Sequence, residues 1–193
     1  MLIEEPRNIE PKGLHTYIHV EDEHGNRILS KKAETLVRAF YQILYGHMSM
    51  GSSTAPDTTG ASQTITRRDD SPSVNAASGD ATFGIVVGTG ATPVSMLDYN
   101  LASPIPHGTG SGQLLYGETS ITPVEVIGNI VRFYITRLLT NTSGADIMVN
   151  EVGLIAVSGA TSPYKFLIDR TLATFIIPNG SSRNIIYEIR VVL

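Results

Sequence analysis

The sequence predicts a mainly β protein, an antiparallel β-sandwich of jelly-roll type preceded by a β-hairpin and one amphipathic helix. Two runs, residues 130–137 and 184–191, alternate apolar and polar side chains. Successive side chains of a strand point to opposite faces, so each run would bury one face and expose the other. The apolar positions are Val131, Phe133 and Ile135 in the first run and Ile185, Tyr187, Ile189 and Val191 in the second.

Turn-forming segments separate these strands and complete the prediction. Residues 141–144, 158–163 and 178–182 are rich in Gly, Asn, Ser and Pro. We interpret the Asn-x-Ser triplets at Asn141 and Asn179 as turn chemistry rather than glycan attachment sites.

The chain divides into four expected parts. Residues 1–13, with two prolines and a glycine, are expected to form an extended N-terminal arm, and 14–46 a hairpin plus helix. Residues 47–80 lack hydrophobic periodicity and predict a long Ser/Thr/Gly-rich loop. Residues 81–193 are expected to form the sandwich domain.

The hairpin and the helix follow from local pattern. Strands are expected at 14–20 and 27–29, around a polar turn at 23–26. Ser30 is a candidate N-cap and Gly46 a candidate helix end. One apolar stripe at helical spacing lies between them. Its members are Ala33, Leu36, Val37, Phe40 and Leu44.

Composition excludes several classes of function. The chain has 193 residues, 41% of them hydrophobic, with a net charge of −4 and no cysteine. It can bury one core, and its charge argues against nucleic acid as a partner. The lack of cysteine excludes disulfides and fits assembly in a reducing cytosol. No apolar run is long enough to span a membrane, and the acidic N-terminus does not resemble a signal peptide.

Two glycine-rich turns do not fit nucleotide binding. Gly88-Thr89-Gly90 follows a strand, but the third glycine of a dinucleotide fingerprint is missing. The run from Gly108 to Gly112 is not followed by the Lys-Ser/Thr of a phosphate loop. We therefore expect tight turns and no cofactor.

Two charged clusters are interpreted as structural. His15 and His19 share a strand face, and with His24 and the acidic residues 21–23 they offer metal-ligand chemistry without a defined ligand spacing. We favour a solvated hairpin face and no metal. Residues 67–70, Arg-Arg-Asp-Asp, are interpreted as a solvated loop, with an intersubunit contact as the alternative.

No catalytic constellation is present in the sequence. There is no Gly-x-Ser-x-Gly elbow and no cysteine nucleophile, and the carboxylates are scattered. We expect a protein that is not an enzyme. A buried carboxylate pair, or a metal at His15 and His19, would revive the enzyme hypothesis.

Several short motifs follow one another along the second half of the chain. They are FGIVVGTGATP at 83–93, LDYNL at 97–101, SPI at 103–105, VNEVGL at 149–154, FLIDR at 166–170, IPNG at 177–180 and the strand ending at Val192. This succession resembles small virion proteins of tailed bacteriophages, including tail-fibre-type and tail-accessory domains. The resemblance covers residues 83–193 and extends more loosely to the hairpin and helix.

The resemblance implies a non-enzymatic structural subunit of a virion and supplies no active-site residues. The arm and the loop would dock onto neighbouring subunits of the tail or collar, or of the outer head surface. The implied partners are further copies, as a homotrimer, and other virion proteins, assembled in the host cytoplasm. A fibre anchoring domain continues into a shaft, whereas this sequence stops at Leu193, so we expect a stand-alone accessory subunit.

A second hypothesis is a sandwich module that binds a host-surface carbohydrate. Such sites stack aromatic side chains on sugar rings, and this chain has no tryptophan. Tyr99, Tyr116 and Tyr164 are the candidate stacking residues.

Overall fold

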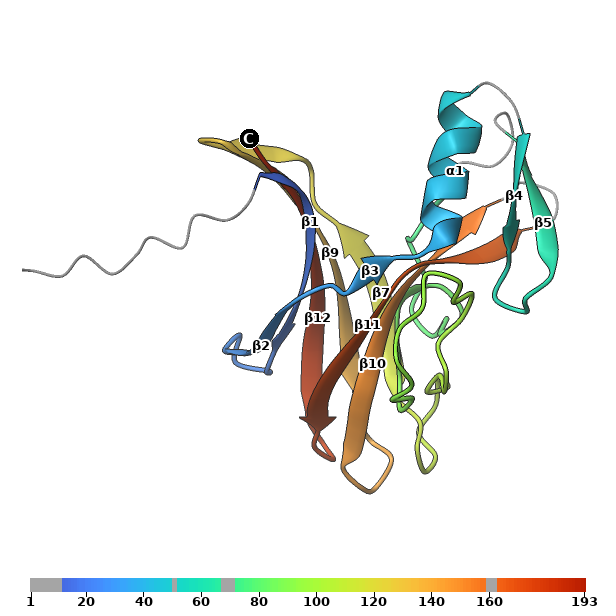
Figure 1. Ribbon diagram of the computed structural model, residues 1–193. Helices are drawn as coiled ribbons and strands as arrows, with labels where there is room; N and C mark the ends of the chain where they lie inside the picture. Colours follow the sequence, from blue (N-terminus) through green and yellow to red (C-terminus); the bar gives the residue numbers. More distant parts are fainter. Residues whose placement is uncertain (1–11, 50–51, 67–71, 159–162) are drawn as a thin grey trace, which may run out of the picture.

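Two antiparallel β-sheets pack face to face in the computed structural model (Figure 1). The structure describes residues 12–49, 52–66, 72–158 and 163–193. This arrangement confirms the predicted mainly β, antiparallel fold with one short helix.

The larger sheet, sheet A, has the strand order β2-β1-β12-β9-β7, and β8 pairs with β9 beyond the end of β7. Its strands are β1 (Gly13–Glu21), β2 (Arg27–Lys32), β7 (Leu115–Ile121), β8 (Glu125–Ile127), β9 (Ile130–Thr140) and β12 (Ser182–Val192).

The smaller sheet, sheet B, has the order β3-β11-β10-β6, and a separate hairpin, β4–β5, lies beside the helix α1 at one end of the molecule (Figure 1). Sheet B contains β3 (Thr35–Leu36), β6 (Gly84–Gly88), β10 (Ile147–Ser158) and β11 (Tyr164–Ile177). The remaining elements are α1 (Arg38–Met48), β4 (Ser52–Pro56) and β5 (Ser62–Thr66).

The core lies between the inner faces of the two sheets. Ile185 and Tyr187 of β12 and Ile135 of β9 are buried, as the alternation predicted. They face apolar side chains of sheet B such as Val152 and Ile177. Phe133 differs, because it is only partly buried at the edge of this core.

The predicted hairpin at 14–29 is part of the sandwich rather than a unit that precedes it. β1 pairs with β12 along its whole length, from Gly13 opposite Val192 to Glu21 opposite Asn184. β2 then extends the same sheet by pairing with β1. Of the predicted arm, residues 1–11 lie outside the described residues.

The predicted helix start at Ser30 is wrong. Ser30 lies in β2 opposite His19, and β3 pairs with β11, so both segments gain sheet hydrogen bonds that compete with helix formation. The helix begins at Arg38 after Val37 and continues past Gly46 to Met48. Gly46 is explained by a close contact, because a Cβ there would lie 2.9 Å from the Ser53 hydroxyl of β4.

The predicted long loop at 47–80 contains the β4–β5 hairpin. Asp57 shapes its turn by accepting hydrogen bonds from the backbone N–H groups of Thr59 and Ala61. Ala55 and Ile65 are buried, and both strands contact α1. With one buried aliphatic residue in each strand, the alternation was too weak to show in the sequence. The cluster at 67–70 lies outside the described residues.

Candidate functional site

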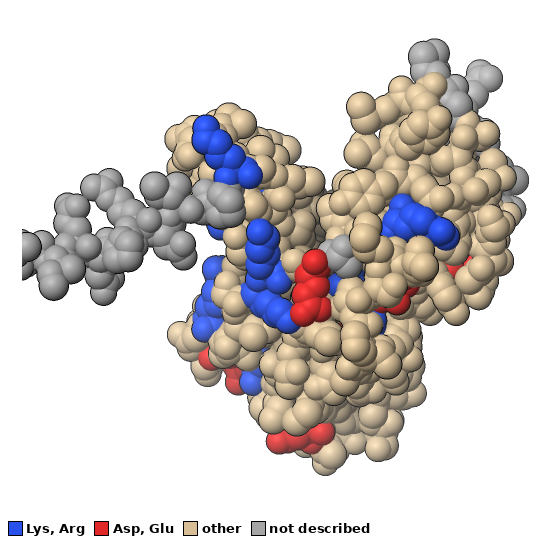
Figure 2. Space-filling view, in the orientation of Figure 1, with Lys and Arg blue, Asp and Glu red and all other residues tan. Residues whose placement is uncertain are grey.

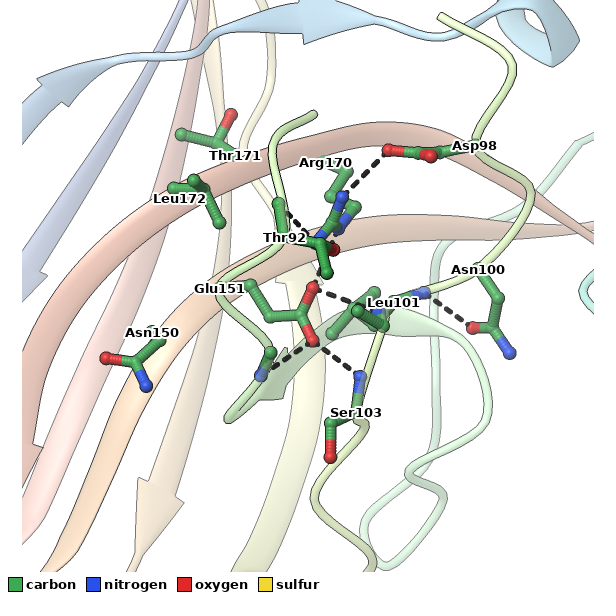
Figure 3. Close-up of polar contacts among 12 residues, drawn as sticks. Thr92, Asp98, Asn100, Leu101, Ser103, Asn150, Glu151, Arg170, Thr171 and Leu172 are labelled. Atoms are coloured by element: carbon green, nitrogen blue, oxygen red, sulfur yellow. Dashed lines mark hydrogen bonds and ion pairs between the residues drawn. The ribbon is translucent and has the colours of Figure 1, made fainter. Parts of the chain in front are cut away.

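Four of the sequence motifs, those at 83–93, 97–101, 149–154 and 166–170, meet on the outer face of sheet B (Figure 3). Glu151 of β10 and Arg170 of β11 lie there side by side, with the Arg170 Nε 2.7 Å from a Glu151 carboxylate oxygen. Both side chains are almost completely buried. These two residues belong to the VNEVGL and FLIDR motifs, which lie on the consecutive strands β10 and β11.

The side chain of Glu151 holds the backbone of the loop 89–104. Its two carboxylate oxygens accept hydrogen bonds from the N–H groups of Gly90, Ala102 and Ser103 at 2.8–3.1 Å. The loop is thereby attached at both of its ends to one buried side chain.

Arg170 holds the middle of the same loop. Its guanidinium donates to the Asp98 carboxylate at 2.8 Å and to the backbone and side-chain oxygens of Thr92 at 3.1 and 3.0 Å. Burial alone would lower the pKa of Arg170, but its hydrogen bonds to Glu151 and Asp98 raise it above the ordinary value. We call Thr92, Asp98, Glu151 and Arg170 the Glu151–Arg170 cluster.

Three motif glycines make room for this cluster. A Cβ at Gly88 or Gly90 would collide with the Glu151 carboxylate, and one at Gly153 would collide with the Leu101 side chain. The glycines of VGTG and EVGL are therefore explained by close packing. The predicted tight turn at Gly88-Thr89-Gly90 is wrong, because this segment is extended, with the Thr89 N–H donating to the Ser103 carbonyl.

A polar pocket of about 430 Å³ opens beside the Glu151–Arg170 cluster. Tyr99 lines it and is 44% exposed, with its ring against Gly60, where a Cβ would lie 3.2 Å from the ring. Thr58, Asp98 and Asn100 also line the pocket. An aromatic ring beside hydroxyl, amide and carboxylate groups suits a neutral hydroxyl-rich ligand.

The other two candidate stacking tyrosines do not lie in this pocket. Tyr116 is buried, its hydroxyl donates to the Ile105 carbonyl at 2.8 Å, and burial raises its pKa. Tyr164 begins β11 and is half-buried. The structure thus leaves Tyr99 as the stacking candidate among the three.

The interpretation of His15 and His19 as a solvated face is wrong, because both side chains are buried. They lie on the outer face of sheet A, where the Nε2 of His19 is 3.0 Å from Glu188 and its Nδ1 is 2.9 Å from the Ser30 hydroxyl. Glu188 also contacts Arg190 at 3.3 Å. The sheet neighbours that enclose His19 come from β2 and β12, which local sequence could not reveal.

His24 lies apart from His15 and His19 and is exposed in the β1–β2 turn. Its backbone N–H donates a hydrogen bond to the Asp22 carboxylate. Within the described ranges, no three His, Asp or Glu side chains are grouped so that they could hold a metal ion.

The run from Gly108 to Gly112 is a turn in the structure. The Gln113 side chain accepts a hydrogen bond from the Gly110 N–H at 2.8 Å, and the Gly108 N–H pairs with the Leu114 carbonyl.

Arg137 is a buried residue that sequence reasoning missed. Its guanidinium donates to the carbonyl oxygens of Ala77, Asp80, Phe83, Ile85 and Gly117 and stacks over the Tyr116 ring at 4.9 Å. Burial lowers its pKa. Arg137 fixes the segment that leads into β6.

Asp169 is a second buried group that was missed. It lies in the core between the sheets, where one carboxylate oxygen accepts hydrogen bonds from Thr171 and Tyr187, each at 3.0 Å. The other oxygen has no hydrogen-bond partner. Burial raises the pKa of Asp169 to about 7, despite these two hydrogen bonds, and the nearby negative charge of Glu34 adds to the increase.

An apolar groove of about 460 Å³ opens at the end of the sandwich, between α1 and the inner faces of the two sheets. Figure 2 shows the corresponding division of the upper end of the molecule into two lobes. The residues that define the apolar groove here are Phe40 and Leu44 of α1, Ile121, Phe133 and Ile189 of sheet A, and Ile168 of sheet B.

No known protein family, curated protein or solved structure matches this chain. In the described part of the chain, no helix has the length and hydrophobicity needed to cross a bilayer.

Proposed function

We propose that this chain is a non-enzymatic structural subunit of a tailed-phage virion, which docks onto neighbouring subunits of the tail, the collar or the outer head. Four of the seven motifs that suggested this class supply the Glu151–Arg170 cluster, in which both Glu151 oxygens and all three Arg170 nitrogens are hydrogen-bonded within the chain. That observation carries the proposal, because hydrogen bonds that hold the loop account for these motif residues, and binding of a substrate is not required to explain them.

The remaining surface supports a role in assembly. The apolar groove and the adjoining face of α1 expose large apolar side chains, which soluble monomers rarely gather in one place. Tyr41, Tyr45 and Met48 of α1 are each more than half exposed. Contact with another protein would remove them from water.

The direct test is to look for the protein in particles. Virions purified from cells that carry this sequence would be analysed by mass spectrometry and then imaged with an antibody against the chain. We expect many copies per particle, with the label at the head surface or at the tail. Absence from purified particles that contain their other structural proteins would contradict the proposal.

A second candidate function is carbohydrate binding at the polar pocket. The observation in its favour is the exposed ring of Tyr99 next to Asp98 and Asn100. A glycan array with the intact protein tests it. A signal lost in Tyr99→Ala but kept in Tyr45→Ala, a matched change on α1, would favour this module over a purely structural subunit.

A further inference from the structure

We propose that the apolar groove binds the N-terminal segment, residues 1–11, of a second copy of this chain. This inference rests on the proposed structural role and names the surface and the segment through which copies would join. Its apolar contacts would come from Met1, Leu2 and Ile3.

The groove is open along a continuous apolar surface. On the sheet A side, Ile121 is 43% exposed, and Phe133 and Ile189 are only partly buried. On the α1 side, Leu44 is 45% exposed. The described residues that line the groove include no Lys, Arg, Asp or Glu. Such a surface fits an apolar segment rather than a polar ligand.

A second hollow, of about 230 Å³, adjoins the apolar groove, because Thr16 of its lining lies opposite Ile189 of the groove in the β1–β12 pairing. Leu14 of β1 and Tyr41 of α1 line it together, and each is about half exposed. The first described strand therefore begins beside the opening, because Leu14 is its second residue.

The sequence outside the described residues indicates the occupant. Of the four segments outside them, residues 1–11 alone contain consecutive large apolar residues, Met1-Leu2-Ile3. Eleven extended residues span about 36 Å, so the segment is long enough to reach from one molecule to another.

The spacer, residues 4–12, favours docking of the apolar tip, residues 1–3, onto a second copy over docking onto the same chain. Residues 4–12 include Pro6 and Pro11, which bias their surroundings towards extended backbone. In an extended conformation nine residues would span about 30 Å. Residues 1–3 would then reach a neighbouring molecule more easily than the groove of their own chain.

Disulfide trapping tests the proposal cleanly because the chain has no cysteine. Full-length Leu2→Cys and full-length Leu44→Cys proteins are mixed and oxidised, and the products are separated on a non-reducing gel. The control pairs Leu2→Cys with Asp146→Cys, an exposed position in the β9–β10 turn, outside the apolar groove. Docking raises the effective concentration of the two sulfurs, so we expect roughly tenfold more mixed dimer than in the control.

Sedimentation supplies a second measurement. The full-length double variant Leu2→Asp/Ile3→Asp is expected to lose self-association, whereas Arg7→Gln is expected to keep it. Mixed dimer no more abundant than in the control would overturn the proposal. So would a Leu2→Cys/Leu44→Cys protein that closes its disulfide within one chain at high dilution. Either failure leaves the virion assignment to be decided by the particle analysis.

Discussion

The loop at 89–104 and the apolar groove differ in whether their exposed groups are covered by other parts of the same chain. The loop is covered from within, because Glu151 and Arg170 satisfy its backbone groups and are themselves buried. The groove is left open, with Leu44 and Ile121 still in contact with water. The difference teaches that the charged and glycine residues of the sequence motifs serve internal packing, whereas most of the residues that define the apolar groove, such as Phe40, Leu44 and Ile121, lie outside those motifs.

The largest effect is expected from breaking the Glu151–Arg170 cluster. Arg170→Met leaves the Glu151 carboxylate buried without its cation, so we expect a loss of about 3–5 kcal/mol in the free energy of unfolding. Urea denaturation measures it. Arg27→Met is the control, since the pair between Arg27 and Glu21 is exposed and its loss should cost less than about 1 kcal/mol. Equal effects of the two variants would refute a structural role for the cluster.

Asp169 predicts a pH dependence of stability. Its pKa is raised in the folded protein to about 7 from an ordinary value of 3.8, so the folded state binds the proton more tightly than the unfolded state. Stability is therefore lost as the pH rises from about 4 to about 7, by as much as roughly 4 kcal/mol from this group.

Asp169→Asn isolates this contribution, because the amide oxygen still accepts from Thr171 and Tyr187. We expect the variant to be more stable than the natural protein at pH 8 and its stability to depend less on pH between 4 and 8, as measured by urea denaturation. Parallel curves for the two proteins would show that Asp169 titrates near its ordinary pKa.

Two phenylalanines sharpen the contrast between closed core and open groove. Phe166 is 1% exposed, so Phe166→Ala should destabilise the protein by about 3–5 kcal/mol. The sequence alone suggests a similar value for Phe133 on the core face of its strand. Because Phe133 lies at the groove, we expect about 1–2 kcal/mol for Phe133→Ala. Equal losses would mean that the groove is closed in solution.

The smallest effect on the isolated subunit is expected on the exposed face of α1. Tyr45 is 62% exposed, so Tyr45→Ser should change the free energy of unfolding by less than about 0.5 kcal/mol. Its incorporation into particles, measured by competition with the natural protein, should fall if this face is an interface. Normal incorporation would confine the interface to the groove itself.

The sequence predicted those elements whose signal is local. The alternation around Ile185 and Tyr187 identified a strand with one buried face, and both residues are fully buried. The helix start failed because β2 continues past Leu29, with Ser30 opposite His19, and because Asp169 of β11, distant in sequence, holds Leu36 in a strand.

The buried charges were beyond local sequence reasoning for the same physical cause. Arg137 is satisfied by five carbonyl groups, four of them from residues 77–85, and Asp169 by Tyr187 of the opposite sheet. No pattern of residues adjacent in the sequence predicts such contacts. The burial of His19 likewise depends on Glu188, 169 residues away.

Hydrogen–deuterium exchange, compared between the isolated subunit and purified particles, tests the central claim most directly. Incorporation should slow exchange in α1 and at the groove-lining strand β9, and should leave exchange in the loop 89–104 unchanged, since that loop is already held from within. Slower exchange in the loop with no change in α1 and β9 would contradict the account.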